Sequence, residues 1–165
     1  MKNIDFILSL IDEDRFTFED YVKSLDFDLN GISLEYAMLY VWIDRWELVN
    51  KEERLKQYFI DNIISEEKEI KTYRGLYLDD SFVEMTNEDI LNYVRENSED
   101  LVSTTTSLNT AIGYSDLMET KFILILECTG TEYKSLENFE VCYESEIIMY
   151  KPKVRIHSIE RKWLK

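Results

Sequence analysis

The stretch FILILE, residues 122 to 127, is a short apolar run of the kind that forms a buried strand. Four other short runs are apolar or alternate between apolar and polar residues, and they lie at Lys71 to Leu78, Leu101 to Thr104, Glu146 to Tyr150 and Val154 to Ile159. All five runs fall after residue 70, so they predict a strand-rich C-terminal part. Pro152 lies between the last two runs, where a turn tolerates its missing N–H.

The first seventy residues follow a different pattern. Apolar side chains recur there at helical spacing in two sets, which are Leu34, Ala37, Met38, Val41, Trp42 and Leu48, and then Leu55, Tyr58, Phe59 and Ile63. We expect the aromatic residues of this part to pack in a core or an interface rather than to bind a cofactor. One more short helix is predicted between the first two strands, because Thr86 precedes Asp89 by three residues in a helix-capping pattern.

Helices followed mostly by strands, without a regular alternation of the two, predict an α+β fold. The chain has 165 residues, of which 45% are hydrophobic, and this is enough for one substantial core but not for two ordinary domains. No stretch has the composition of a flexible linker. We therefore expect a single domain over residues 1–165, with a helical part at 1–70 and a strand-rich part at 71–165.

The charge balance limits the classes of partner. The 19 basic and 34 acidic residues give a formal net charge of -15. This charge disfavours binding to nucleic acid through phosphate contacts and suits a cationic protein partner, although an excess of acid also serves solubility alone. No apolar run is long enough to cross a membrane, and the N-terminus lacks the pattern of a secretory signal, so we expect a cytoplasmic protein.

Reactive side chains are few. Cys128 and Cys142 are the only cysteines, which is too few for a disulfide framework or a four-ligand zinc site within one chain. His157 is the only histidine, and it lies in an alternating run, where we expect a partly buried structural side chain. The chemistry must therefore come from other residue types.

The first candidate motif is Tyr73-Arg74-Gly75-Leu76-Tyr77. It places an arginine inside a predicted strand, and a guanidinium can hold a pyrophosphate through two parallel hydrogen bonds. Gly75 has no side chain, so another group can approach the backbone closely. The alternative is that Arg74 forms a solvent-facing ion pair.

The second candidate motif is Leu101-Val102-Ser103-Thr104-Thr105-Thr106-Ser107, a strand that runs into a hydroxyl cluster and then into a predicted short helix. Hydroxyl groups both donate and accept hydrogen bonds, so one of them can orient a carboxylate. The alternative is that Thr106 or Ser107 caps the helix.

The third candidate motif is Glu144-Ser145-Glu146. Residues two apart in a strand point to the same face, so both carboxylates are expected to converge on one site. Two neighbouring acids are suited to general-base work or to stabilising a cation. The alternative is ordinary surface charge.

The order of these motifs, with the apolar runs around them, resembles the arginine-serine-glutamate class of mono-ADP-ribosyltransferases, which includes cholera-type and clostridial toxins and small bacteriophage enzymes. The resemblance rests on YRGLYLD, LVSTTTSLNTAIGY, KFILILE and ESEIIMYKPKVRIHSIE, and it covers Lys71 to Ile159. Arg74 and Ser103 are 29 residues apart, and Ser103 and Glu146 are 43 apart. The resemblance implies a mixed, mainly antiparallel core of two sheets.

The resemblance also implies which residues bind NAD. Arg74 corresponds to the arginine that grips the NAD phosphate, and the Gly75 backbone to the group that meets the nicotinamide carboxamide. Ser103 corresponds to the first serine of the Ser-Thr-Ser motif, and Thr104 follows it in the same cofactor-binding segment. Tyr114 corresponds to the aromatic residue that stacks on nicotinamide.

The two glutamates have separate implied roles. Glu146 corresponds to the catalytic glutamate, which the motif serine steadies, and Glu144 to the acid that marks members that modify arginine. This sequence reads Ser-Thr-Thr from Ser103, so the shifted register Thr105-Thr106-Ser107 stays open.

The resemblance thus implies transfer of ADP-ribose from NAD to an arginine of a target protein, with release of nicotinamide and no metal. Two alternatives remain. The chain could be an NAD glycohydrolase, in which water replaces the protein acceptor, or a non-catalytic phage structural or interaction module with the same fold.

Overall fold

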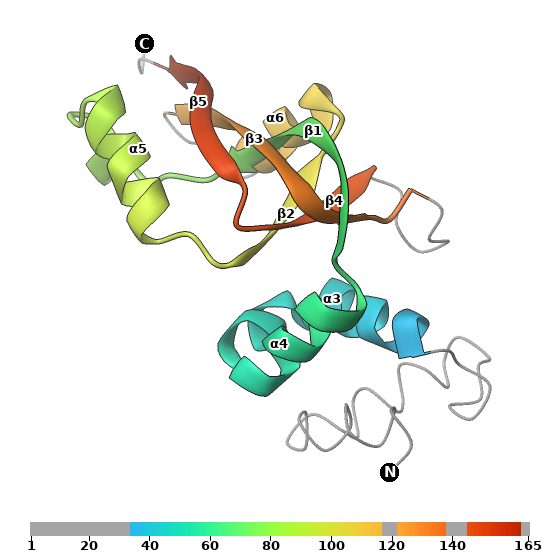
Figure 1. Cartoon of the computed structure of the whole chain (residues 1–165). Helices are drawn as coiled ribbons and strands as arrows, with labels where there is room; N and C mark the ends of the chain where they lie inside the picture. The colour runs from blue at the N-terminus through green and yellow to red at the C-terminus, as the bar shows by residue number, and fades with distance from the viewer. Residues whose placement is uncertain (1–33, 117–121, 138–144, 163–165) are drawn as a thin grey trace. The chain divides into compact units, whose positions relative to one another are not determined.

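The computed structural model describes residues 34–116, 122–137 and 145–162. The chain divides into two compact units, Met1–Ile63 and Ile64–Lys165, and each is described by itself (Figure 1). Within the described residues, no helix is both long and apolar enough to cross a membrane.

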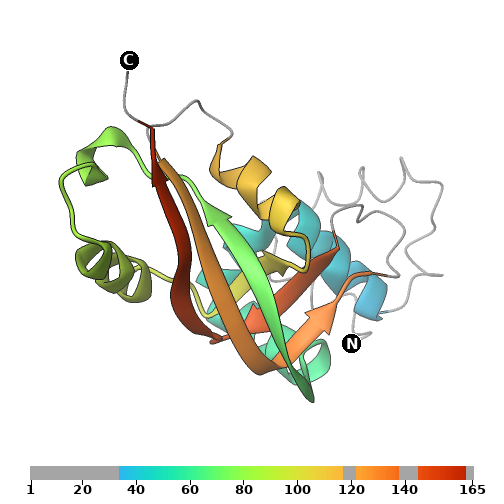
Figure 2. The ribbon, with the colours of Figure 1, turned by 90° about the horizontal axis from the view of Figure 1, so that it is seen from above.

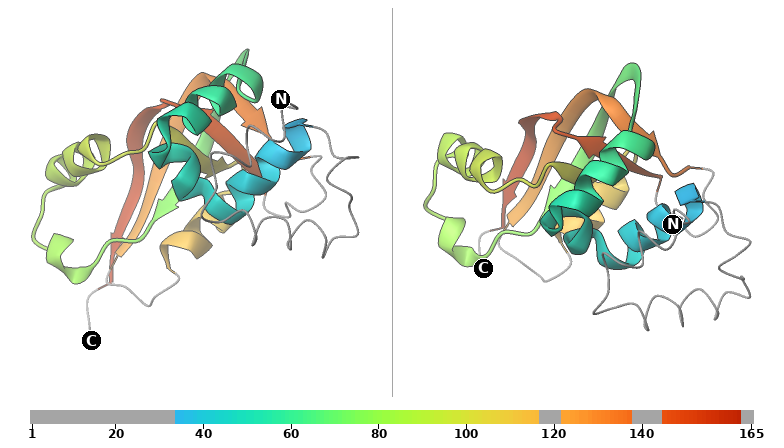
Figure 3. Two further views of the ribbon diagram at one scale, coloured as in Figure 1. Left: turned by 90° about the horizontal axis from the view of Figure 1, so that it is seen from below. Right: turned by 60° about the horizontal axis from the view of Figure 1, so that its bottom comes forward.

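The described part of the first unit consists of two helices, α3 (Leu34–Lys51) and α4 (Glu53–Asn62), which pack against each other (Figure 3). Six consecutive residues of α3, from Ala37 to Trp42, are buried, so this helix is covered on all sides there. In α4 only one face is buried, through Leu55 and Phe59, which are four residues apart. The Trp42 ring lies 5.6 Å from the Phe59 ring, which confirms the expected packing role of Trp42.

The residues of the second unit that the structure describes form five strands and three short helical segments. In chain order these are β1 (Ser65–Leu76), η2 (Asp80–Phe82), α5 (Asn87–Glu96), β2 (Leu101–Thr105), α6 (Leu108–Ser115), β3 (Phe122–Ser135), β4 (Glu146–Tyr150) and β5 (Lys153–Arg161). Each of the five apolar runs forms a strand. The predicted cap of α5 is also present, because the Asp89 N–H donates to Thr86 Oγ1 at 3.1 Å.

The predicted boundary between helical and strand-rich parts, at residue 70, is wrong. Strand β1 begins at Ser65, and α4 ends at Asn62. The residues from Ser65 to Glu69 are polar and exposed, so they lack the alternation that marks a strand. They are strand because Ser65 and Glu66 pair with the far end of β3, which extends to Ser135.

The two-sheet core is also not observed, because the strands form one sheet in the order β1-β2-β4-β3-β5 (Figure 2). Every strand pair among the described residues is antiparallel. Strand β3 is 14 residues long, and its first part pairs with β5 while Tyr133–Ser135 pair with β4. Strand β3 also pairs with β1, so β3 and the β1–β2 pair both connect the five strands into one sheet.

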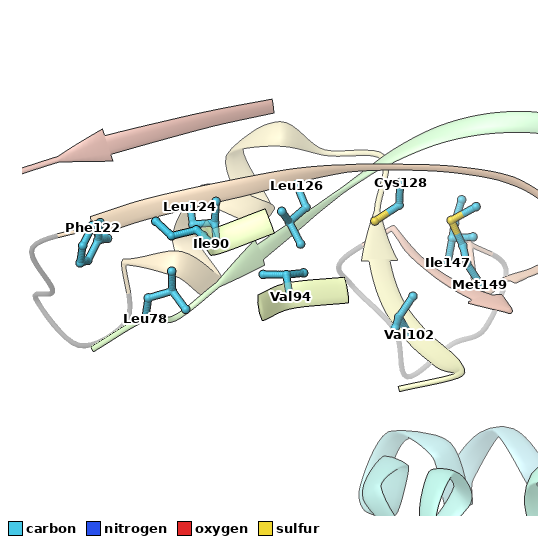
Figure 4. Packing of buried hydrophobic residues seen from close by; sticks show 10 residues of the cluster. All are labelled: Leu78, Ile90, Val94, Val102, Phe122, Leu124, Leu126, Cys128, Ile147 and Met149. Carbon is cyan, nitrogen blue, oxygen red and sulfur yellow. The ribbon is translucent and has the colours of Figure 1, made fainter. Parts of the chain in front are cut away.

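The core of this unit lies on one face of the sheet. Helix α5 contributes Ile90 and Val94, which pack with Leu124 and Leu126 of β3 (Figure 4). The ten buried residues of the core cluster are Leu78, Ile90, Val94, Val102, Phe122, Leu124, Leu126, Cys128, Ile147 and Met149. Helix α6 lies on the other side of the strands (Figure 2), where Ser115 Oγ donates to the Leu76 carbonyl at 2.8 Å.

Candidate active site

Strands β1 and β2 meet at a single residue pair, Tyr73 and Thr105. Beyond this pair, residues 74–76 of β1 have no partner on β2, whereas β2 stays paired with β4 over its whole length. The two strands therefore diverge, and we call residues 74–76 and 101–104 the two arms of the β1–β2 fork. The first two candidate motifs lie on these arms.

The structure brings Ser103 and Glu146 together. Ser103 Oγ donates a hydrogen bond to Glu146 Oε1 at 2.7 Å. The register explains this contact, because Glu146 lies opposite Thr105 and is therefore the diagonal neighbour of Ser103 on the same face. Ser103 is exposed and Glu146 is half-buried, so solvent or a ligand can reach the pair.

Three other hydroxyl groups of the second motif form hydrogen bonds within the fold. Thr104 is buried on the opposite face, and its Oγ1 donates to the Ile147 carbonyl at 2.8 Å. Thr105 Oγ1 accepts from the Ser107 N–H, and Ser107 Oγ accepts from the Thr110 N–H as the cap of α6. The register that starts at Ser103 therefore fits the geometry, and the Thr104 side chain is turned away from Glu146.

The expected strand relationship between the two glutamates is not tested, because only Glu146 is among the described residues. Strand β4 begins at Glu146, and the preceding Ser145 has a φ of 51°, in the left-handed region. A φ in this region is uncommon for a residue with a side chain, and it marks the point where β4 begins. Glu144 lies outside the described residues.

Arg74 lies on the arm of β1 but does not contact the Ser103–Glu146 pair. It is opposite Leu126 of the core cluster, so its side chain leaves β1 on the core face. Within the part of the chain that the structure describes, its guanidinium has no hydrogen bond and no ion pair. The alternative of a solvent-facing ion pair is therefore not seen for Arg74 among the described residues.

The electrostatics around Arg74 and Cys128 reflect their burial. Burial lowers the pKa of the Arg74 guanidinium, and the neighbouring Cys128 and Glu99 oppose this shift. Burial raises the pKa of the Cys128 thiol to about 11, and the positive charge of Arg74 counteracts part of the rise. Among the described residues, Arg74 is thus a partly buried cation that no acid contacts in an ion pair, a state that an anionic ligand would relieve.

Gly75 is required by helix α6. A Cβ atom at this position would lie 1.8 Å from the backbone oxygen of Ala111, so the close approach that the glycine permits is that of α6. Ala111 is fully buried against β1. Tyr114, three residues further along α6, is 45% exposed, so its ring is accessible.

Sequence reasoning missed a second polar cluster, on the outer face of β1, β3 and β5. Its centre is Glu127, a buried acid at the end of the FILILE run, surrounded by Lys71, Arg155 and His157. The only sequence signal for this cluster is an acid, Glu127, at the end of an apolar run. The basic residues around Glu127 lie on two other strands, so no local pattern places them beside it.

Among the described residues, no group of three or more His, Cys, Asp or Glu side chains is arranged to hold a metal ion. No protein-family model matches the chain, and no curated protein matches it either.

Proposed function

We propose that this chain transfers ADP-ribose from NAD to an arginine side chain of a target protein and releases nicotinamide. The observation that carries the proposal is the hydrogen bond between Ser103 and Glu146, which are 43 residues apart in the sequence. The resemblance to arginine-serine-glutamate transferases implies this contact, because in that class the motif serine steadies the catalytic glutamate.

The reaction breaks the bond between C1′ of the ribose and the nicotinamide nitrogen. The electron pair leaves with nicotinamide, and positive charge develops on the ribose. A carboxylate at the ribose 2′-hydroxyl stabilises this charge more in the transition state than in the ground state, which is the requirement for catalysis. Glu146 is suited to this role because the hydrogen bond from Ser103 Oγ fixes the orientation of its carboxylate.

The acceptor of the ADP-ribose group is an arginine of the target protein. A guanidinium nitrogen of the target arginine forms the new bond to C1′ and loses one proton. In the proposal Glu144 holds that guanidinium and accepts the proton, as its place in the motif implies. The net negative charge of the chain favours approach of a cationic target.

Arg74 is proposed to bind the NAD pyrophosphate. Its guanidinium has no partner among the described residues, and the edge of β1 beside it is not paired with β2. An arginine side chain is long and flexible enough to reach a ligand at that open edge. Gly75 and Tyr114 would then contribute the backbone contact and the stacking contact to nicotinamide.

The test is incubation of the chain with NAD labelled in its ADP-ribose part, together with an arginine-rich protein mixture. We expect a labelled protein, and a loss of about 10²-fold to 10³-fold in rate for Glu146→Gln. Glu144→Gln should lose transfer but keep some NAD hydrolysis. Free ADP-ribose without labelled protein would support an NAD glycohydrolase instead, and no turnover of NAD would support a binding module.

A further inference from the structure

The cluster around Glu127 concentrates positive charge on an acidic chain. The Glu127 side chain is only 7% exposed, and Arg155 Nη2 lies 2.5 Å from its Oε1. Lys71 Nζ and His157 Nδ1 lie 3.8 Å and 4.0 Å from its Oε2. The single negative charge of Glu127 therefore faces the positive charges of Lys71 and Arg155, with His157 beside them. The cluster carries a net positive charge.

The cations of this cluster remain accessible. The side chains of Lys71 and Arg155 are 52% and 69% exposed, in contrast to the buried carboxylate beneath them. Glu127 thus fixes their positions from below without covering their charged ends. An anchored and accessible pair of cations is suited to binding a phosphate group.

An aromatic surface adjoins these cations. The pairing of β3 with β5 shifts register between Ile125 and Leu126, which leaves His157 as the extra residue of a bulge. Its ring contacts the Tyr73 ring edge-on, with 5.1 Å between the centroids. The His157 side chain is 35% exposed, so one ring is available for a base to stack on.

The strand register connects this cluster with the candidate active site. Glu127 lies opposite Tyr73, Tyr73 opposite Thr105, and Thr105 opposite Glu146. Three strand spacings separate Glu127 from Glu146 along this path, so their Cα atoms lie at most about 14 Å apart. An extended dinucleotide can span this distance, and its path crosses the turn that leads from Thr105 into α6.

We propose that Lys71, Arg155 and His157 bind the adenosine end of the dinucleotide. The two cations bind the phosphate of the pyrophosphate on the adenosine side, which leaves the phosphate on the nicotinamide side for Arg74, and the histidine ring stacks on the purine. This assignment rests on the proposed function, which places the nicotinamide ribose at Glu146. It gives the substrate a direction across the sheet, from β4 at the nicotinamide end to β5 at the purine end.

The experiment measures binding of ADP and of adenosine by calorimetry at low salt. We expect Lys71→Gln to weaken ADP about fivefold and to leave adenosine unchanged, because only ADP carries phosphate. His157→Ala should weaken both ligands. Lys68→Gln is the matched control, since Lys68 is an exposed lysine on the same strand. Arg155 is not replaced, because its loss would leave the buried Glu127 carboxylate without its nearest cation.

The outcomes separate this assignment from the proposed function. If Lys71→Gln and Lys68→Gln bind ADP with equal affinity, or if the unaltered chain does not bind ADP, the assignment is wrong. If the chain turns over NAD and Lys71→Gln does not change the KM for NAD, the assignment is wrong but the proposed function stands. If ADP binding depends on Lys71 but the chain does not release nicotinamide from NAD, the proposed function is wrong and the binding site for ADP stands.

Discussion

Replacing Ser103 with alanine removes the hydroxyl that holds Glu146. The two groups are joined by a 2.7 Å hydrogen bond, and a hydrogen bond to a charged group contributes about 1.5 to 3 kcal/mol. A loss of this size in the transition state corresponds to about 10-fold to 100-fold in rate. Ser103 is exposed, so water can replace part of the bond, and we expect the lower end, about tenfold.

The assay for Ser103→Ala is nicotinamide release from NAD under saturating conditions, so that kcat is measured apart from KM. The fold should be almost unaffected, because surface substitutions usually change stability by about 0.5 kcal/mol or less. Ser98→Ala is the matched control, since Ser98 is also an exposed serine and lies outside the fork. Equal kcat values for the two variants would refute the role assigned to Ser103.

Two further predictions concern the frame of the site. Gly75→Ala should destabilise the fold by about 3 kcal/mol or more in urea unfolding, because its Cβ would overlap the backbone of Ala111. Gly113→Ala is the control and should be neutral or stabilising, because the space around its Cβ is open. Similar stabilities of the two variants would contradict the close packing of α6 on β1. In a Cys142→Ser background, Cys128 should resist thiol reagents at pH 8, since its pKa is raised from 9.0 to about 11. The thiol binds its proton more tightly in the folded state, so its stabilising contribution is complete below pH 9 and is lost as pH rises through 11. A Cys128→Ala variant should lack this part of the decline, and fast labelling of the folded chain would contradict the burial of Cys128.

The sequence predicts the features of this fold that depend on local patterns. The five apolar runs predict five strands because each run is long enough to bury one face. The Thr86 cap predicts the start of α5 because the contact with Asp89 lies within one helical turn. Both predictions depend on residues close together in the chain.

Features that depend on distant pairing are not visible in the sequence. The early start of β1 at Ser65 follows from its pairing with the end of β3 near Tyr133, and polar residues there give no strand signal. The left-handed Ser145 also has no signal, since serine rarely adopts this conformation and the surrounding structure must impose it.

The candidate site is predictable only in part. Ser103 and Glu146 meet as the resemblance implies, because their strands are paired in the register that makes them diagonal neighbours. The orientation of Arg74 toward the core face depends on its pairing with Leu126, a contact that no local pattern around Arg74 encodes. The cluster around Glu127 escapes prediction for the same reason, since it joins three strands.

The most direct measurement is a crystal structure of the Glu146→Gln variant with NAD bound. The nicotinamide ribose should lie within hydrogen-bonding distance of Ser103 and of the side chain at position 146, with the Arg74 guanidinium turned to the pyrophosphate. NAD bound away from the β1–β2 fork, or Arg74 still facing Leu126 without touching the ligand, would show that these three residues do not form one active site.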